Sequence, residues 1–280
     1  MDIPAVHYIG RLAPSPTGLL HLGHAATFWT AYQRACAAGG KLLLRNEDLD
    51  PQRSQPQFVE AMLEDLAWLG IEWQPPMLSQ STRLDAYREA FDRLLAAGAV
   101  YPCTCSRREL AQMTQAPHED DDEPVYSGRC RSAPGTRSSF DPNASYRFRV
   151  PAGEPIQFDD ANFGPQSYTA DRDFGDFLVW RRPLGPREPG TPSYQLACVV
   201  DDAFMSITEV VRGADLLRST ARQILLQRAL GLPTVTYFHT PLLRDPSGVR
   251  LAKRHDALAL RTLRQRGLSP ADVRSRFTQE

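Results

Sequence analysis

Lysine is almost absent from this chain. Only Lys41 and Lys253 are lysines among its 32 basic residues, and arginine supplies the rest. Arginine presents a planar fork of donors that suits carboxylates and phosphates, whereas lysine is a compact point charge. A lysine kept in so arginine-rich a chain therefore indicates a position where a point charge is needed, and Lys253 is such a position.

The chain also has no long apolar run and no export leader, and its number of cysteines is odd. No apolar stretch reaches about 18 residues, so we expect no membrane span, and the N-terminus has no basic-then-apolar leader. Five cysteines in 280 residues are typical of reduced thiols in a cytoplasmic protein. Ordinary apolar and charged fractions predict a globular protein with one large domain that carries an insertion.

Neither sign of charge is in excess over the whole chain, but the basic residues are unevenly distributed. The formal net charge is −1, which by itself disfavours a nucleic-acid partner. From Arg212 to Glu280, however, thirteen Arg and Lys residues stand against five Asp and Glu residues. Such a basic end predicts contact with a phosphate backbone, and the simpler interpretation is a set of solvated helix faces.

A strand, a Pro/Gly loop and a helix are predicted in succession near the N-terminus. Residues 6–9 favour a strand, and an apolar pattern with helical spacing leads to Gly39. His21 and His24 fall in the first turn of that helix, on either side of Gly23. A helix start offers free N–H groups and a positive dipole end, and imidazoles can donate to phosphate oxygens. This pattern predicts a phosphate site, although two surface histidines at a helix start would look the same.

The alternation of strands and helices predicts the fold class. A strand at 41–44 and helices near 54–69 and 84–97 favour an α/β fold with a Rossmann-like, doubly wound parallel sheet. Ser54 and Gln57 resemble a capping box. Ligands of such a sheet bind at the carboxyl ends of the strands.

Proline and glycine become frequent after about Tyr101, which predicts an inserted α+β subdomain. We expect the sheet to resume near Ser193, with a short helical tail at the end of the chain. The expected divisions are residues 1–100 and 193–245 for the two halves of the main domain, 101–192 for the insertion, and 246–280 for a loop and the tail. The further elements expected are a helix at 216–230, a strand at 235–238 and two helices within 255–277.

Four ordered blocks of sequence carry a family resemblance. Residues 11–24, RLAPSPTGLLHLGH, resemble the "HIGH" signature of class I aminoacyl-tRNA synthetases in its glutamyl form. The resemblance continues in GKLLLRNEDLD (40–50), YQLACVVDD (194–202) and EVVRGAD (209–215). The family implies ATP-dependent activation of an amino acid, whose carboxylate attacks the α-phosphorus in line, with Mg²⁺ accompanying ATP. The protein mainly positions the reactants and neutralises charge on phosphate oxygens.

The resemblance implies an ATP site and catalytic roles. His21, Gly23 and His24 would bind ATP, together with Lys253 in a "KMSKS"-like loop. His21, His24 and Lys253 would be catalytic. That loop reads Arg250-Leu251-Ala252-Lys253-Arg254 here, so only Lys253 keeps an ammonium for the phosphates.

The resemblance also implies a glutamate site. Arg11 and Arg212 can each make a bidentate pair with a carboxylate, and Glu47 can accept from the ammonium. Which arginine takes which carboxylate stays open, and Glu47 could instead form a surface ion pair with Arg45 or Arg53. Two arginines favour glutamate over glutamine, because an unpaired buried cation is costly. The implied glutamate-binding residues are Arg11, Ala13, Ser15, Glu47, Tyr194 and Arg212.

A cysteine cluster predicts a structural metal site in the insertion. Cys103, Cys105 and Cys130 fit zinc, Zn²⁺, in number and chemistry. The family with this pattern uses the tyrosine, here Tyr126, as fourth ligand, and His118 is the chemically commoner alternative. Three reduced cysteines without a metal remain the simpler interpretation.

The short tail narrows the resemblance. Only 26 residues follow Arg254, whereas an ordinary glutamyl-tRNA synthetase continues into anticodon-binding domains of well over about 100 residues. The shorter form resembles the glutamyl-queuosine tRNA(Asp) synthetase family, which esterifies glutamate to queuosine in the anticodon loop of tRNA(Asp). The resemblance implies a monomeric cytoplasmic ligase whose partners are glutamate, ATP and queuosine-containing tRNA(Asp).

Three alternative functions are compatible with parts of the sequence. Conventional charging of a tRNA 3′ end is disfavoured only by the short tail. A non-catalytic relative that binds RNA or adenylate is disfavoured by His21, His24 and Lys253. A small nucleotidyltransferase is disfavoured by the PSPTG loop and the cysteine cluster.

Overall fold

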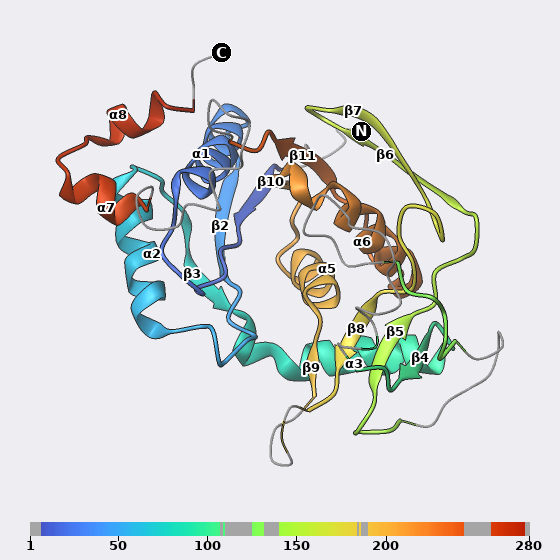
Figure 1. Cartoon of the computed structure of the whole chain (residues 1–280). Coiled ribbons are helices and arrows are strands. Elements are labelled where there is room, and N and C mark those ends of the chain that lie inside the picture. Colours follow the sequence, from blue (N-terminus) through green and yellow to red (C-terminus); the bar gives the residue numbers. More distant parts are fainter. Residues whose placement is uncertain are drawn as a thin grey trace.

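A three-stranded parallel sheet forms the first half of the fold. The computed structural model describes residues 7–106, 109, 125–131, 140–183, 185, 190–243 and 259–277. The strands, in the order β1-β2-β3, are β1 (Ile9–Leu12), β2 (Lys41–Asn46) and β3 (Gln74–Ser79). Helices α1 (Leu22–Ala37) and α2 (Pro56–Trp68) connect them, and Figure 1 shows both helices beside this sheet.

The second half continues the first. Strands β10 (Glu209–Gly213) and β11 (Thr236–Thr240) are parallel and joined through α6 (Leu217–Leu230). Strand β1 lies next to the start of β10, because the Thr208 backbone N–H donates to the Ile9 carbonyl at 2.9 Å. The carboxyl ends of β1 and β10 therefore meet at one edge, and the expected α/β fold with a parallel sheet is confirmed.

The insertion carries an antiparallel sheet, as expected, packed against α3 (Leu84–Ala96). Its strands are β4 (Val100–Cys103), β5 (Ser145–Phe148), β8 (Leu178–Arg181) and β9 (Thr191–Pro192). The hairpin of β6 (Pro155–Asp160) and β7 (Gly164–Thr169) leaves this sheet and joins β11 through the pair Tyr237–Asp160. A segment of the insertion thus becomes part of the second half of the main sheet (Figure 1).

Helix α5 (Tyr194–Phe204) corrects the expectation that the sheet resumes near Ser193. The Ser193 hydroxyl caps this helix, and the sheet resumes only at Glu209. The stretch from Leu196 to Val199 is buried on all sides between neighbouring elements, and an apolar run of this kind does not distinguish a buried helix from a strand.

Two smaller expectations are also wrong. The first strand begins at Ile9 rather than ending there, because Arg11 is buried by its polar partners and a hydropathy pattern registers it as exposed. Helix α2 has no side-chain cap, since its N-cap is Gln55 and Pro56 opens the helix, so the proposed Ser54/Gln57 box is absent.

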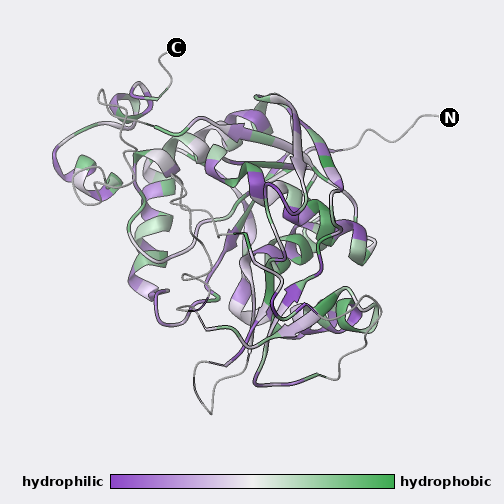
Figure 2. Ribbon diagram, turned by 45° about the vertical axis from the view of Figure 1, so that its right-hand side comes forward, coloured by the Kyte–Doolittle hydropathy of each residue, from purple (hydrophilic) through white to green (hydrophobic). Residues whose placement is uncertain are grey.

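The C-terminal helices agree with the sequence pattern. They are α7 (Leu260–Gln265) and α8 (Pro270–Arg274), and Ser269 forms a capping box with Asp272. Hydrophilic and hydrophobic residues alternate along the helices (Figure 2), as expected for elements with one buried face. Among the described residues, no helix combines the length and hydrophobicity needed to cross a bilayer.

Candidate active site

Two stacked histidines begin helix α1. The His21 Nδ1 accepts from the Gly23 backbone N–H at 3.1 Å, and the His24 Nδ1 accepts from the His21 backbone N–H at 3.3 Å. The ring centroids are 3.7 Å apart. A ring nitrogen that accepts a hydrogen bond carries no proton, so each neutral ring has its N–H at Nε2. Both rings can therefore donate to an anion at the helix start, where the dipole also favours one.

Gly23 packs closely against the histidine stack. A Cβ at this position would lie 3.0 Å from the His21 Cε1 and 3.2 Å from its Nδ1. A side chain here would require the His21 ring to shift by a few tenths of an ångström. The loop ahead of the helix is held by the Glu47 backbone N–H, which donates to the Pro14 carbonyl at 3.0 Å.

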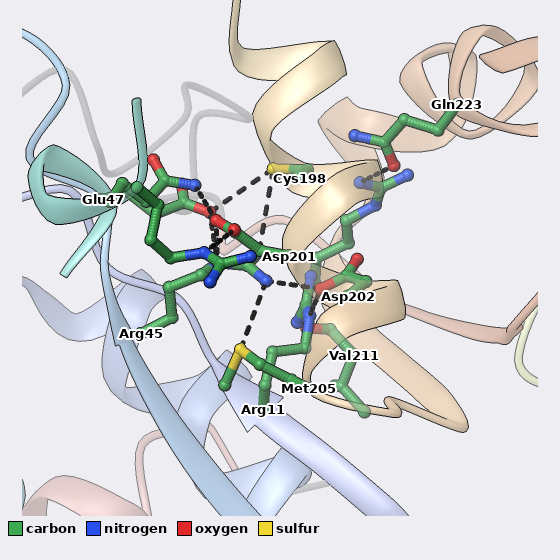
Figure 3. Close-up of polar contacts among 12 residues, drawn as sticks. Arg11, Arg45, Glu47, Cys198, Asp201, Asp202, Met205, Val211 and Gln223 are labelled. Carbon is green, nitrogen blue, oxygen red and sulfur yellow. Dashed lines mark hydrogen bonds and ion pairs between the residues drawn. The ribbon is translucent and has the colours of Figure 1, made fainter. Parts of the chain in front are cut away.

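Glu47 lies in a buried ion-pair network rather than in a surface ion pair (Figure 3). The Arg45 Nη2 contacts the Glu47 Oε1 at 3.0 Å, and the Arg45 Nη1 contacts the Asp202 Oδ1 at 2.5 Å. Cys198 also donates to the Glu47 Oε1, at 3.4 Å. All hydrogen bonds of this carboxylate within the described part of the chain use Oε1, so Oε2 can accept from an ammonium.

Arg11 has a carboxylate neighbour as well. Its Nε lies 3.5 Å from the Asp202 Oδ1, and its Nη1 donates to the Val211 carbonyl at 2.8 Å. Burial opposes the charge on Asp202, but Arg45 and Arg11 hold its pKa below the usual value. Asp202 is therefore ionised and neutralises cations in this region.

Arg212 is different, because all three of its partners are neutral. It is 5% exposed, and its Nε, Nη1 and Nη2 donate to the His239 Nε2 at 3.2 Å, the Gln223 Oε1 at 2.8 Å and the Thr220 Oγ1 at 2.7 Å. Within the described residues no carboxylate forms an ion pair with it. One N–H on each Nη atom also has no hydrogen-bond partner there. Arg212 thus offers a charged fork to an incoming anion.

One cavity of about 620 Å³ joins these groups. It brings together the nine described residues that the sequence assigned to ATP or glutamate: Arg11, Ala13, Ser15, His21, Gly23, His24, Glu47, Tyr194 and Arg212. Arg53 and Asp215 also line it, and sequence reasoning gave neither of them a role.

Lys253, the remaining ATP candidate, lies outside the described residues, as does His118. The described chain on either side of residues 244–258 touches this region. Leu243 lines the cavity, and Ala259 forms a β-bridge with His21.

The cysteine cluster lies in the antiparallel part. The sulfur atoms of Cys103, Cys105 and Cys130 are all within 4.8 Å of one another. The Tyr126 hydroxyl lies 3.6 Å from the Cys103 Sγ and 3.5 Å from the Cys105 Sγ. Burial opposes ionisation of Cys130, but hydrogen bonds from Tyr126, the Thr104 backbone and the other two cysteines lower its pKa to about 7. These donors are suited to a metal ion. In Figure 1, β4 lies at the opposite end of the molecule from α1.

Comparison with known proteins is consistent with this arrangement. Residues 8–277 match the family "tRNA synthetases class I (E and Q), catalytic domain". The chain belongs to this family. It is 44% identical over 276 residues to the Glutamyl-Q tRNA(Asp) synthetase of Nitratidesulfovibrio vulgaris, covering 94% of this chain and 83% of that protein. The same identity over 278 residues relates it to the Glutamyl-Q tRNA(Asp) synthetase of Rhodobacter capsulatus, covering 95% and 98%. The resemblance inferred from the four sequence blocks is confirmed.

A solved structure shares the fold. The glutamate tRNA ligase of Elizabethkingia meningosepticum, crystallised with its amino acid, superposes with a TM-score of 0.72 at 28% identity. The match covers 88% of this chain and 52% of that enzyme, so the chain spans about half the length of that enzyme.

Proposed function

We propose that this protein is an ATP-dependent ligase that activates L-glutamate as glutamyl-adenylate and transfers it to queuosine in the anticodon loop of tRNA(Asp). The observation that carries the proposal is the single cavity in which the paired imidazoles of α1 face a buried arginine fork. Its relatives of similar length bear the name of this activity.

Charge supports an acidic substrate. Around the cavity, Arg11, Arg45 and Arg83 pair with Glu47, Asp201 and Asp202. Arg212 is left with neutral partners only. Because no carboxylate among the described residues contacts Arg212 directly, a substrate carboxylate can pair with it. Glutamate offers a side-chain carboxylate for this contact, whereas glutamine offers a neutral amide. Leaving a buried cation unpaired costs several kcal/mol, so we expect glutamate to be strongly preferred.

The other groups fit the parts of the reactants. Glu47 would accept from the substrate ammonium through Oε2, and the Tyr194 hydroxyl would contact a substrate oxygen. The Nε2–H groups of His21 and His24 would donate to ATP phosphate oxygens as the glutamate carboxylate attacks the α-phosphorus and pyrophosphate leaves. Lys253 would add an ammonium to those phosphates, and Mg²⁺ would accompany ATP.

A structural zinc ion is part of the proposal. Cys103, Cys105 and Cys130 would hold it through sulfur, with Tyr126 rather than His118 as fourth ligand, because the Tyr126 hydroxyl already lies within 3.6 Å of two of the sulfurs. The role is structural, since the cluster is on the far side of the fold from the cavity. All five cysteines are free thiols in this structure, which fits a reducing compartment. The proposed enzyme is therefore cytoplasmic, and we also propose that it acts as a monomer.

The deciding experiment uses labelled glutamate, ATP and tRNA from cells that can or cannot make queuosine. Each pool is tested intact and after removal of the 3′-terminal adenosine. We expect label to require queuosine and to survive removal of the adenosine. Label that ignores queuosine but needs the terminal adenosine would establish conventional charging instead. Absence of glutamate-dependent pyrophosphate exchange would indicate a binding protein.

A further inference from the structure

His239 lies directly behind Arg212, on the side away from the cavity. It is fully buried in β11, and none of its atoms lines the cavity. Its Nε2 accepts from the Arg212 Nε at 3.2 Å and lies 3.2 Å from the Thr220 Oγ1. An arginine N–H can only donate, so Nε2 must be the unprotonated ring nitrogen.

Asp160 fixes that tautomer from the other side of the ring. The His239 Nδ1 lies 2.6 Å from the Asp160 Oδ2, and a carboxylate can only accept, so the proton is at Nδ1. The same carboxylate accepts the backbone N–H groups of His239, Asn162 and Phe163. It is thus held rigidly at the end of β6, which belongs to the inserted segment.

Of the groups that face the ring, only Asp160 favours the protonated form, and burial and the two arginines outweigh it. Burial first, then Arg212, lower the pKa of His239 to about 4, although Asp160 opposes the shift. Arg11 also faces it from β1, and the Tyr237 ring stacks near it on β11. A protonated ring would turn an N–H toward the Arg212 Nε–H, with two donors in contact and no acceptor between them.

We propose that His239, oriented by Asp160, is a positioning residue that aims the Arg212 fork into the cavity and thereby sets the selectivity for glutamate. The inference rests on the proposed function. It adds that the inserted segment, through β6, controls an amino-acid-binding side chain on β10.

Two conservative variants separate the two bonds of the ring. In His239→Gln the amide oxygen can replace Nε2 as the acceptor for Arg212. In His239→Asn the amide nitrogen can replace Nδ1 as the donor to Asp160, but no acceptor reaches Arg212. We expect His239→Asn to raise the KM for glutamate about tenfold, the effect of one hydrogen bond to a charged group, with the KM for ATP unchanged. His239→Gln should recover most of the glutamate affinity.

The readouts distinguish positioning from a general structural role. Pyrophosphate exchange is measured with glutamate and with glutamine, and the melting temperature of each variant is recorded. A lower glutamate-to-glutamine ratio in His239→Asn alone supports the proposal. Equal losses in both variants, or a parallel rise in the KM for ATP, would overturn it.

A spectroscopic measurement does not depend on activity. In ¹⁵N-labelled wild-type protein, the His239 ring should be the Nδ1–H tautomer from pH 5.5 to 8.5. An Nε2–H tautomer or a protonated ring in that range would refute the proposed orientation. Failure of the wild type to exchange pyrophosphate with glutamate would instead refute the proposed function, so the two failures are distinct.

Discussion

Arg45 and Arg212 are both buried arginines near the same cavity, but their surroundings are opposite. Arg45 has carboxylates on two sides, Glu47 and Asp202, and is fully buried. Arg212 has only neutral acceptors. The first arrangement is closed, because its charges are satisfied within the protein. The second is open, because no carboxylate among the described residues contacts Arg212 directly, and we propose that a substrate carboxylate takes that place.

We expect the largest loss of stability when Arg45 is removed from its buried ion-pair network. Arg45→Met would leave Glu47 buried without its cation and Asp202 with Arg11 alone, and removal of one partner of a buried pair costs about 3–5 kcal/mol. Urea unfolding measures this loss. Arg228→Met, which removes an exposed ion pair with Glu154, is the control and should change the free energy of unfolding by less than about 1 kcal/mol. Similar losses in the two variants would show that the Arg45 network is not structural.

Removal of the Arg212 guanidinium should affect glutamate binding far more than the stability of the protein. We expect Arg212→Met to lower kcat/KM for glutamate in pyrophosphate exchange about 100-fold, or roughly 2.7 kcal/mol, with a much smaller change for glutamine. Arg212→Lys keeps the charge and loses the fork, so it should recover only part of the activity. A loss of equal size for both amino acids would contradict the assignment of Arg212 to a substrate carboxylate.

The cysteine cluster is a second open arrangement, in which the donors are present and the proposed cation comes from outside. Cys105→Ser should abolish the zinc that copurifies with the protein and lower stability by about 2–3 kcal/mol, the gain expected when a ligand is present at 100 times its Kd. Elemental analysis and thermal unfolding test this. Cys36→Ser, at an exposed thiol of α1, should change neither. If wild-type protein purified without chelator contains no metal, the proposed zinc site is wrong.

Periodicity and short motifs predicted much of this fold. The helix start at His21, the boundaries of α3 and the helices of the tail follow from apolar spacing and caps. Helix α5 was missed because Leu196 to Val199 form a continuous buried apolar run, and such a run does not distinguish a helix from a strand.

Apart from the pairing of Glu47 with Arg45, considered as a surface ion pair and found buried, the partners of the site residues could not be predicted. Arg45 and Asp202 are 157 residues apart in sequence, and Asp160 and His239 are 79 apart. A charged residue within a strand is normally interpreted as exposed. Only the fold brings the second charge beside it, and no local spacing encodes that contact. The residues proposed to touch substrate follow from motifs and line one cavity, whereas the residues that hold them could not be found in this way.

Asp65 is a buried carboxylate whose charge is only partly compensated. Its side chain on α2 is inaccessible and has no hydrogen-bond partner among the described residues, and its ion pair with the Arg264 Nη2 on α7 is long, at 3.8 Å from Oδ1. Burial, opposed by Arg264 and Arg261, raises its pKa from 3.8 to about 6. A raised carboxyl pKa means that its favourable contribution is present below about pH 4 and is lost as the pH rises through 6.

Asp65→Asn should therefore stabilise the protein at pH 8 and leave it unchanged at pH 4. A shift of two pKa units corresponds to roughly 2.7 kcal/mol, and the buried amide that replaces the carboxylate reduces the gain to about 2 kcal/mol. Urea unfolding across this pH range measures the difference. Glu64→Gln is the matched neighbour, because Arg264 lowers the Glu64 pKa, so this variant should lose stability at pH 8. A gain for Asp65→Asn that does not vary with pH would mean that the carboxylate is already neutral or paired, and the contrast between open and closed charges would not extend to α2.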